Sequence, residues 1–240
     1  MKKRALRKDF YMEIRKSLGR FLSIFFIVAM GVAFFSGIRA SEPDLRYSGD
    51  AYFDRNHLMD LKVMGTLGLT ENDVQAIRSL EGVAQAEPGY SADVMVERDG
   101  NQKVLHVSSI LDSMNQYTVE EGRMPKKDGE CLIDQDFIQG SDLKVGDEIT
   151  LISGTKDPVT DTFTKETFRI VGAGSSPEYI SFHRGSSMIG NGEVSGFLAV
   201  PKESFVTEAY TECYVSVEGA EEETAFTEEY DQKVEKVAER

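Results

Sequence analysis

Hydrophobic positions follow two different patterns along this 240-residue chain. Residues 21–38 form one run of 18 residues with no charged side chain, whereas later apolar residues come in short stretches between glycine, aspartate and proline. A helix rises about 1.5 Å per residue, so the run and its neighbours cross the roughly 30 Å hydrocarbon core of a bilayer. Backbone groups in lipid must be satisfied within the segment. We therefore predict a transmembrane helix over residues 21–40.

A cleaved signal peptide is the alternative interpretation of the same run. Ala40 is a small residue at a position after which a peptidase would cut. However, the run is longer than the about 7–15 apolar residues of a signal peptide, and its charged leader is long as well. We therefore expect the helix to be retained as a membrane anchor.

Residues 1–20 repeat apolar side chains at every fourth position, with lysine and arginine between them. The repeated positions are Leu6, Phe10, Ile14 and Leu18. This pattern predicts an amphipathic helix on the inner membrane surface, in contact with lipid; a continuation of the spanning helix is the alternative. The segment holds eight basic and two acidic residues, which places it in the cytoplasm by the positive-inside rule.

Small residues recur at intervals of four within the predicted span. Ala29, Ala33 and Gly37 lie on one face of the helix, where small side chains let another helix approach closely. We predict that this face packs against other transmembrane helices, although an alanine-rich segment also produces such spacing by chance.

A small α/β unit is predicted over residues 41–117, beginning with a polar connector at 41–60. A strand follows at 61–67, and then a helix with Thr70 as N-cap, Asp73 as its capping-box partner and Gly82 at its end.

Two further strands are predicted in this unit, at 92–97 and 103–108. The Asp99-Gly100 turn between them is typical of a hairpin. The order strand, helix, strand, strand indicates a layered α/β arrangement.

A mainly β module is predicted over residues 118–219, where glycine, aspartate and short β-type runs dominate. The expected strands are 131–134, 148–152, 164–171, 196–200 and 212–218. Together with the preceding unit, this gives an α+β outer domain.

Residues 220–240 are predicted to form an acidic helix, the start of a coiled-coil-like stalk. Its apolar stripe consists of Phe226, Tyr230, Val234 and Val237. No stop signal follows the stripe, so we expect the helix to continue in a longer protein and to have little to bury against by itself.

Charge separates the two ends of the chain. The net charge is −14, but residues 41–240 alone hold 18 basic and 39 acidic side chains. Nucleic-acid binding requires a basic footprint, so we expect no nucleic-acid partner for this region.

The residue types that bind metals or nucleotides are scattered along the chain. His57, His106 and His183 lack metal-ligand spacing with one another or with cysteine. The Gly172-Ala173-Gly174 stretch lacks the third glycine of a phosphate loop, Pro177 prevents an immediate helix, and no Walker A sequence occurs. We expect no metal and no cofactor.

Catalytic nucleophiles are not indicated either. Ser186 and Ser187 lie in a flexible glycine-flanked stretch without the strand–turn–helix context of a nucleophile elbow. We therefore expect no catalytic residues and no enzyme.

Cys131 and Cys213 both fall in β-type runs of the sequence. A disulfide between them is possible outside the membrane, but we favour two small buried side chains.

Seven short motifs, taken together, resemble a known family of membrane proteins. They are RKSLGR at 15–20, EGRMP at 121–125, GECLI at 129–133, KVGDEITL at 144–151, FRIVG at 168–172, SPEYI at 176–180 and GFLAVP at 196–201. The first resembles the start of FtsX-like ABC transporter permeases. The others resemble the MacB-like extracytoplasmic core domain, in the variant of the large permeases of Gram-positive bacteria.

The resemblance implies a non-enzymatic permease subunit in the plasma membrane, with residues 41–240 outside the cell. It implies a separate cytoplasmic ABC ATPase, a second permease copy or further spans, and an unknown extracellular substrate or protein as partners. Such permeases have at least three more spans after the outer domain, so we expect this chain to be the N-terminal part of one.

Export of a peptide, lipid or drug-like molecule is the leading functional hypothesis. A regulator that switches a cell-wall hydrolase by the same motion is the second hypothesis. A single-pass anchor that displays a binding domain, with no ATPase, is the third.

Overall fold

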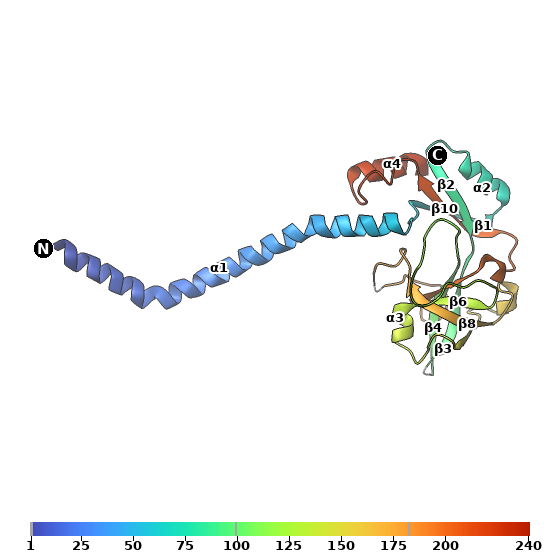
Figure 1. Ribbon diagram of the computed structural model, residues 1–240, viewed down its shortest axis with the longest axis horizontal. Coiled ribbons are helices and arrows are strands. Elements are labelled where there is room, and N and C mark those ends of the chain that lie inside the picture. The colour runs from blue at the N-terminus through green and yellow to red at the C-terminus, as the bar shows by residue number, and fades with distance from the viewer. Residues whose placement is uncertain (1, 99, 182) are drawn as a thin grey trace. The chain divides into compact units, whose positions relative to one another are not determined.

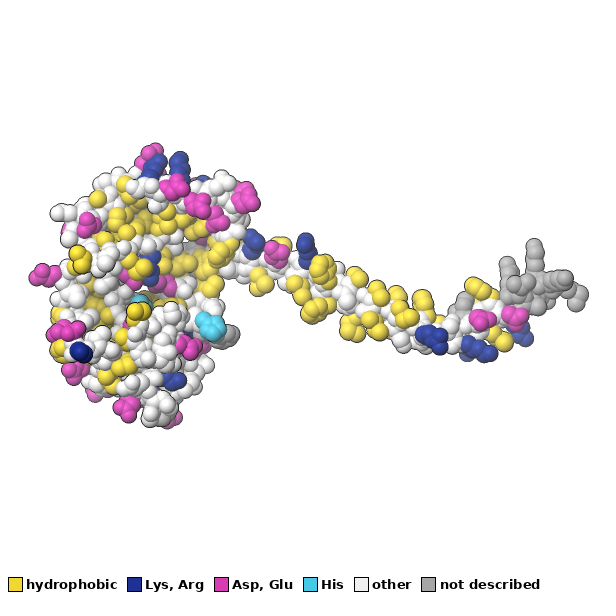
Figure 2. All heavy atoms as spheres, turned by 180° about the vertical axis from the view of Figure 1, so that it is seen from behind, with side chains coloured by type: hydrophobic (Ala, Val, Ile, Leu, Met, Phe, Trp, Pro, Cys, Tyr) yellow, Lys and Arg dark blue, Asp and Glu magenta, His cyan; other side chains and the backbone are white. Residues whose placement is uncertain are grey.

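The computed structural model describes residues 2–98, 100–181 and 183–240 and consists of two units, Met1–Gly49 and Asp50–Arg240. A single helix, α1 (Lys2–Arg55), contains the predicted span (Figure 1). It is the one helix in the described part of the chain that is long and apolar enough to cross a membrane, with a mean hydropathy of 2.4 in its most apolar window. On the face seen in Figure 2 its apolar side chains are uncovered, as a lipid-facing helix requires.

Both flanks of the span are helical as well. The predicted connector at 41–60 is wrong up to Arg55, because α1 continues through Pro43 to that residue. Arg46 pairs with Glu42 one turn away in this part of the helix. The basic leader continues the helix, as the alternative interpretation of residues 1–20 expects. The side chains of Leu6 and Ile14 lie outside the described residues, while Phe10 and Leu18 are exposed.

A three-stranded antiparallel sheet, called here the small sheet, has the order β1-β10-β2. Its strands are β1 (Leu61–Leu69), β2 (Val83–Gly89) and β10 (Tyr210–Val217). Helix α2 (Glu71–Arg78) covers it and contributes Val74 to a core with Cys213 and Val215.

The predicted capping box of α2 is confirmed, since Thr70 accepts from the Asp73 amide and Asp73 accepts from the Thr70 amide. The helix ends at Arg78 with Ser79 as C-cap, so the assignment of its end to Gly82 was wrong. Gly82 has φ +92° in the turn that leads to β2, where a residue without a Cβ is favoured.

A mixed sheet of seven strands, called here the large sheet, has the order β3-β4-β9-β6-β8-β5, and β7 pairs with β8. Strand β4 is parallel to β9 and β6 is parallel to β8, while the other pairs are antiparallel. The bounds are β3 (Ser91–Arg98), β4 (Asn101–Ser109), β5 (Thr118–Gly122), β6 (Glu130–Asp134), β7 (Glu148–Thr150), β8 (Thr167–Ser175) and β9 (Val194–Val200).

The large sheet holds the main core of the molecule. Fully buried side chains from several strands and from the loops around them meet there, among them Phe163, Phe168, Ile133 and Leu198. Helix α3 (Gln135–Gln139) and the 3₁₀ turns η1 (Val159–Asp161) and η2 (Lys202–Ser204) lie between the strands in sequence.

The two sheets interleave along the chain instead of dividing at residue 118. Strands β3 and β4, from the predicted first unit, belong to the large sheet, and β10 returns to the small sheet. Strands β2 and β5 and helix α3 were not predicted. The predicted hairpin does connect β3 to β4; of its two turn residues, Asp99 lies outside the described residues and Gly100 has φ +72°.

Helix α4 (Glu228–Ala238) begins at its N-cap Thr227, so Phe226 precedes the helix instead of opening its stripe. The expectation that this helix has little to bury against is wrong. Val237 is buried against Val217 and Ala220, and Tyr230 and Val234 pack on the same cluster. The hydroxyl of Tyr230 also donates to Asp60 at 2.6 Å.

The two cysteines are buried free thiols, as the favoured interpretation predicted. Cys213 and Val215 share the core face of β10. Gly172 and Gly174 lie inside β8, where a Cβ would come within 2.4 Å of the Arg123 carbonyl oxygen and 2.2 Å of that of Thr118. These glycines allow β5 and its continuation to approach β8 closely, which explains them without a phosphate loop.

Candidate functional site between the two sheets

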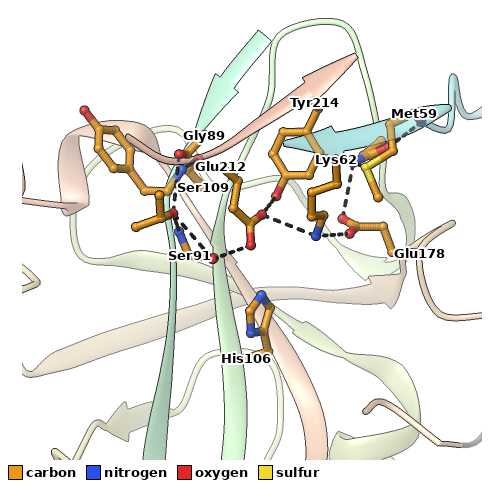
Figure 3. A network of polar contacts seen from close by, with 12 residues as sticks. Met59, Lys62, Gly89, Ser91, His106, Ser109, Glu178, Glu212 and Tyr214 are labelled. Atoms are coloured by element: carbon orange, nitrogen blue, oxygen red, sulfur yellow. Dashed lines mark hydrogen bonds and ion pairs between the residues drawn. The ribbon is translucent and has the colours of Figure 1, made fainter. Parts of the chain in front are cut away.

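A network of charged side chains connects the small sheet to the long segment after β8 (Figure 3). Lys62 of β1 places its Nζ 3.0 Å from Glu178 Oε2 and 3.3 Å from Glu212 Oε2. Glu212 belongs to β10 and Glu178 to the segment that follows β8. One ammonium group therefore lies between two carboxylates from different parts of the fold.

Burial and charge act in opposite directions on this network. Burial disfavours the charged form of Lys62, but the carboxylates of Glu178 and Glu212 outweigh it and raise the lysine pKa. Burial likewise disfavours the Glu212 carboxylate, while Lys62 and hydrogen bonds from Tyr214 and Ser91 lower its pKa overall. Lys62 and Glu212 are consequently both ionised near neutral pH.

Hydrogen bonds from neighbouring elements hold the two carboxylates in place. The Tyr214 hydroxyl donates to Glu212, and Ser91 Oγ of β3 donates to Glu212 Oε1 at 2.7 Å. Asn115 Nδ2 donates to Glu178 Oε1 at 3.3 Å. Residues from both sheets therefore orient Glu212, whereas Lys62 of the small sheet and Asn115 of the loop after β4 orient Glu178.

A second polar group lies on the large sheet beside this network. His106 of β4 places Nδ1 2.7 Å from Asp93 Oδ1 of β3, and the Asp93 Oδ2 accepts from Ser187 Oγ at 2.6 Å. The ring of His106 points toward the Lys62 network (Figure 3). Ser187 and His106 thus both bind Asp93, and the Ser187 hydroxyl donates to this carboxylate rather than to the histidine ring.

The segment after β8 is fixed at a further point by Arg184. Its guanidinium lies 2.7 Å from Asp134 Oδ2 and 2.6 Å from Asp136 Oδ2. Arg184 and Asp134 are both almost fully buried. In the same segment, Tyr179 stacks on Phe197 of β9 with ring centroids 5.5 Å apart.

A cavity of about 490 Å³ opens among these groups. This volume is in the range of ligand pockets, roughly 300–1,000 Å³. Its polar lining consists mainly of Lys62, Asp93, His106, Glu178 and Arg184, and its apolar lining includes Met59, Tyr179, Ile180 and Phe226. We call it the junction cavity.

A second cavity, of about 560 Å³, shares with the junction cavity a wall that includes Phe53, Met59 and Phe226. Six carboxylate side chains line it, and no lysine or arginine is among its lining residues. Burial and the nearby Asp50 raise the pKa of Asp54 in this cavity.

Only some of the candidate functional residues named from the sequence lie at this site. His106, Ser186 and Ser187 lie at or beside the junction cavity, whereas Ala29, Ala33 and Gly37 belong to α1, where a Cβ on Gly37 would meet nothing within 4 Å. Among the described residues, no group of histidine, cysteine and acidic side chains is arranged to hold a metal ion. Lys62 and Glu212 were missed, because isolated charges on strands carry no motif; Glu178 stood within the SPEYI motif.

The profile of the MacB-like periplasmic core domain matches residues 18–233. The chain belongs to this family. Members of the MacB-like family are permease components of ABC transporters rather than catalytic subunits, and the apolar helix α1 makes this member a membrane protein.

Solved structures with low sequence identity resemble this MacB-like chain. The extracellular domain of the noncanonic ABC-type transporter YknZ from Gram-positive bacteria is 13% identical, with a TM-score of 0.40 over 64% of this chain and 75% of that one. The periplasmic region of MacB from Actinobacillus actinomycetemcomitans is 10% identical, with a TM-score of 0.39 over 74% and 73%. A domain of a permease from Porphyromonas gingivalis is 13% identical, with a TM-score of 0.36 over 68% and 76%. No curated protein sequence matches the chain.

Proposed function

We propose that this chain is part of the permease subunit of an ABC-type export or mechanotransmission system. A separate cytoplasmic ATPase drives it, and the outer domain contacts an extracellular substrate or protein. The observation that carries the proposal is the family match, which begins inside the apolar helix and runs through both sheets. The basic leader and the acidic remainder support a cytoplasmic N-terminus and an outer location for residues 41–240.

The proposed topology is tested by labelling introduced cysteines in intact cells. The native thiols of Cys131 and Cys213 are fully buried, so they give little background. A membrane-impermeant maleimide is expected to label Thr155→Cys, an exposed position of the outer domain, in intact cells. Lys8→Cys is expected to react only after permeabilisation, and the opposite result would reverse the topology.

The ATPase partnership is tested by a photo-crosslinking residue in place of Lys16, in the native membrane. The expected product joins the chain to a protein with a Walker A sequence, identified by mass spectrometry. The same crosslinker in place of Ser48, on the opposite side of the span, is the control. An absence of ATPase products at Lys16, or equal amounts from both positions, would favour the single-pass anchor.

A further inference from the structure

The second cavity, called here the acidic cavity, combines negative charge with apolar walls. Its six carboxylates are Asp50 and Asp54 of α1, Asp60 before β1, and Glu221, Glu222 and Glu223 between β10 and α4. Its volume of about 560 Å³ is in the range of ligand pockets, roughly 300–1,000 Å³. The charge at this place therefore surrounds a space that a ligand can enter.

Little positive charge balances these carboxylates. In the part of the chain that the structure describes, one of the six, Glu223, forms an ion pair, with Lys233 at 2.6 Å. The hydrogen bonds that Asp50 and Asp60 accept come from backbone amides and a tyrosine hydroxyl. Such neutral donors orient a carboxylate and leave its charge in place. Five carboxylates of the lining thus have no lysine or arginine partner among the described residues.

The effect of this charge is seen at Asp54. Burial raises the pKa of its carboxyl group most, and repulsion from Asp50, Glu221 and Asp60 raises it further. His57 partly offsets these effects. A carboxylate whose neighbours are mostly carboxylates is stabilised when a cation comes near. The acidic cavity therefore favours a positively charged ligand.

Aromatic and aliphatic side chains supply the apolar part of the wall. The rings of Phe53 and Phe226 meet edge to face with their centroids 5.9 Å apart, and Phe226 is about two-thirds exposed. Leu58 and Met114 line the same cavity. The face of an aromatic ring attracts a cation that lies within about 6 Å of its centroid. The rings and the carboxylates therefore attract the same kind of group.

A bare metal ion does not fit this lining. Metal ions require several ligand atoms that converge on one point, and among the described residues no group of histidine, cysteine and acidic side chains is so arranged. A metal ion would also leave the apolar wall in contact with water. An ammonium group with alkyl or aryl substituents uses both parts of the lining, because its charge meets the carboxylates and its carbon atoms meet the rings.

We propose that the acidic cavity binds a small soluble organic cation, an alkylated ammonium ion with an apolar body. The proposal adds a ligand class to the outer domain. It rests on the proposed function only for the supply of such a cation from outside the cell. Binding itself requires neither the ATPase nor a particular topology.

The test uses the full chain in a non-ionic maltoside detergent, with methionine methyl groups labelled with ¹³C. Phosphocholine lipids and detergents are avoided, because their headgroups carry the same ammonium group. Met114 lines the acidic cavity but not the junction cavity, Met59 lines both, and Met188 is fully exposed and lines neither. The Met114 methyl resonance therefore reports on the acidic cavity, and Met188 is the internal control.

Four probes separate the charge of the ligand from its shape. Choline and benzyltrimethylammonium are the cations. Neohexanol, in which a carbon atom replaces the nitrogen of choline, is the neutral analogue. Glycerophosphocholine, the soluble headgroup of a choline lipid, carries a phosphate next to the same ammonium group. The carboxylates repel this phosphate, so we expect it to bind less tightly than choline.

At least one of the two cations is expected to shift the Met114 resonance saturably and to leave Met188 unchanged, whereas neohexanol is expected to shift neither. Asp54→Asn combined with Glu221→Gln should weaken cation binding about tenfold, because two negative charges leave the lining. Glu229→Gln is the matched control. It removes an exposed carboxylate of α4 outside the lining and should bind like the wild type.

The contribution of the ring is tested by Phe226→Leu. Leucine keeps an apolar side chain at this position and removes the aromatic face, so cation binding should weaken about two- to fivefold. The resonance of Met95, in strand β3 of the large sheet, should stay in place in every variant, which shows that the fold is retained.

Three kinds of result would overturn the proposal. The first is a Met114 resonance that neither cation shifts at about 10 mM, about tenfold above the Kd of a weak, millimolar site. The second is equal binding of neohexanol, or wild-type affinity in the double variant, either of which would show that the carboxylates do not select the ligand. The third is equal or tighter binding of glycerophosphocholine, which would indicate a lipid headgroup instead of a soluble cation. Each of these leaves the ATPase partnership standing, because no ATPase is present in this experiment.

Discussion

The large and small sheets of the Asp50–Arg240 unit differ in what surrounds them. The large sheet encloses one extensive apolar cluster, whose fully buried side chains include Phe168, Ile133, Ile170 and Leu198. The small sheet has a short core under α2 and is connected to the rest through charged groups such as Lys62 and Glu87. Apolar burial is additive and independent of direction, whereas a charged contact holds only while both partners stay aligned. We therefore expect the small sheet to open without the large one.

The largest expected effect comes from the core of the large sheet. Phe168→Ala leaves a cavity where the ring packs edge-on against Phe163, so the free energy of unfolding should fall by about 3–5 kcal/mol. Urea denaturation in nanodiscs measures it. The exposed neighbour Glu166→Ala should change stability by less than about 0.5 kcal/mol. A loss below about 1 kcal/mol for Phe168→Ala would place the main core elsewhere.

A smaller and more local effect is expected in the small sheet. Cys213→Asp buries a carboxyl group without a partner, and because the group can take up a proton the cost is about 1–3 kcal/mol. Hydrogen exchange should show this loss in β1, β2 and β10, with β8 and β9 unchanged. Thr66→Asp, at an exposed position of β1, is the matched control. Equal losses in both sheets would show that they open as one unit.

Acid should loosen one contact inside the large sheet. Hydrogen bonds from Arg123 and from the Lys126 amide lower the pKa of Glu130 from 4.5 to about 2. A lowered carboxyl pKa stabilises the fold above the unfolded-state value, so this contribution is lost as the pH falls from about 4.5 to about 2. The effect is expected to be smaller than the two above, since Arg123 is half exposed and solvent screens it.

Thermal unfolding between pH 5 and pH 2 measures this contribution. Glu130→Gln should flatten the dependence in that window, whereas the exposed Glu193→Gln should leave it unchanged. An identical pH profile for wild type and Glu130→Gln would contradict the assigned pKa.

The smallest effect is expected at the N-terminus of α2. Thr70→Ala removes the side-chain oxygen that caps the helix and should cost about 1 kcal/mol. Hydrogen exchange in α2 measures the cost, and Asn72→Ala, exposed in the same turn, is the control. An unaltered α2 would mean that packing of Val74 alone maintains the helix.

The sequence predicted those elements whose signals are local. The span followed from an uncharged run, α2 from its capping box, and the β3–β4 hairpin from alternation around a turn. Strand β2 was missed because its run VAQAEPG contains a proline and few β-branched residues, and it forms by pairing with β10, more than a hundred residues later. The interleaving of the two sheets was missed for the same reason, because a local sequence pattern does not show which strands pair with each other.

The candidate site was less predictable than the fold. Lys62 and Glu212 are single charges in strands, and only the register between β1 and β10 brings them together with Glu178. The prediction that the apolar stripe of the C-terminal helix has little to bury against was wrong for a related reason. Tyr230, Val234 and Val237 were identified as apolar, but the surface that receives them is formed by Val217 at the end of β10 and by Ala220 in the turn after it.

The register of β1 against β10 also determines how the unit would respond to a pulling force. Leu61 faces Val215 while Leu69 faces Tyr210, so the chain enters and leaves the small sheet at the same end. A load applied between residues 60 and 218 would peel the ladder open one hydrogen-bond pair at a time, starting at Leu61. A shearing load would instead strain all the pairs together. The small sheet is therefore the mechanically soft element of the unit, and it would yield before tension reaches the strands of the large sheet.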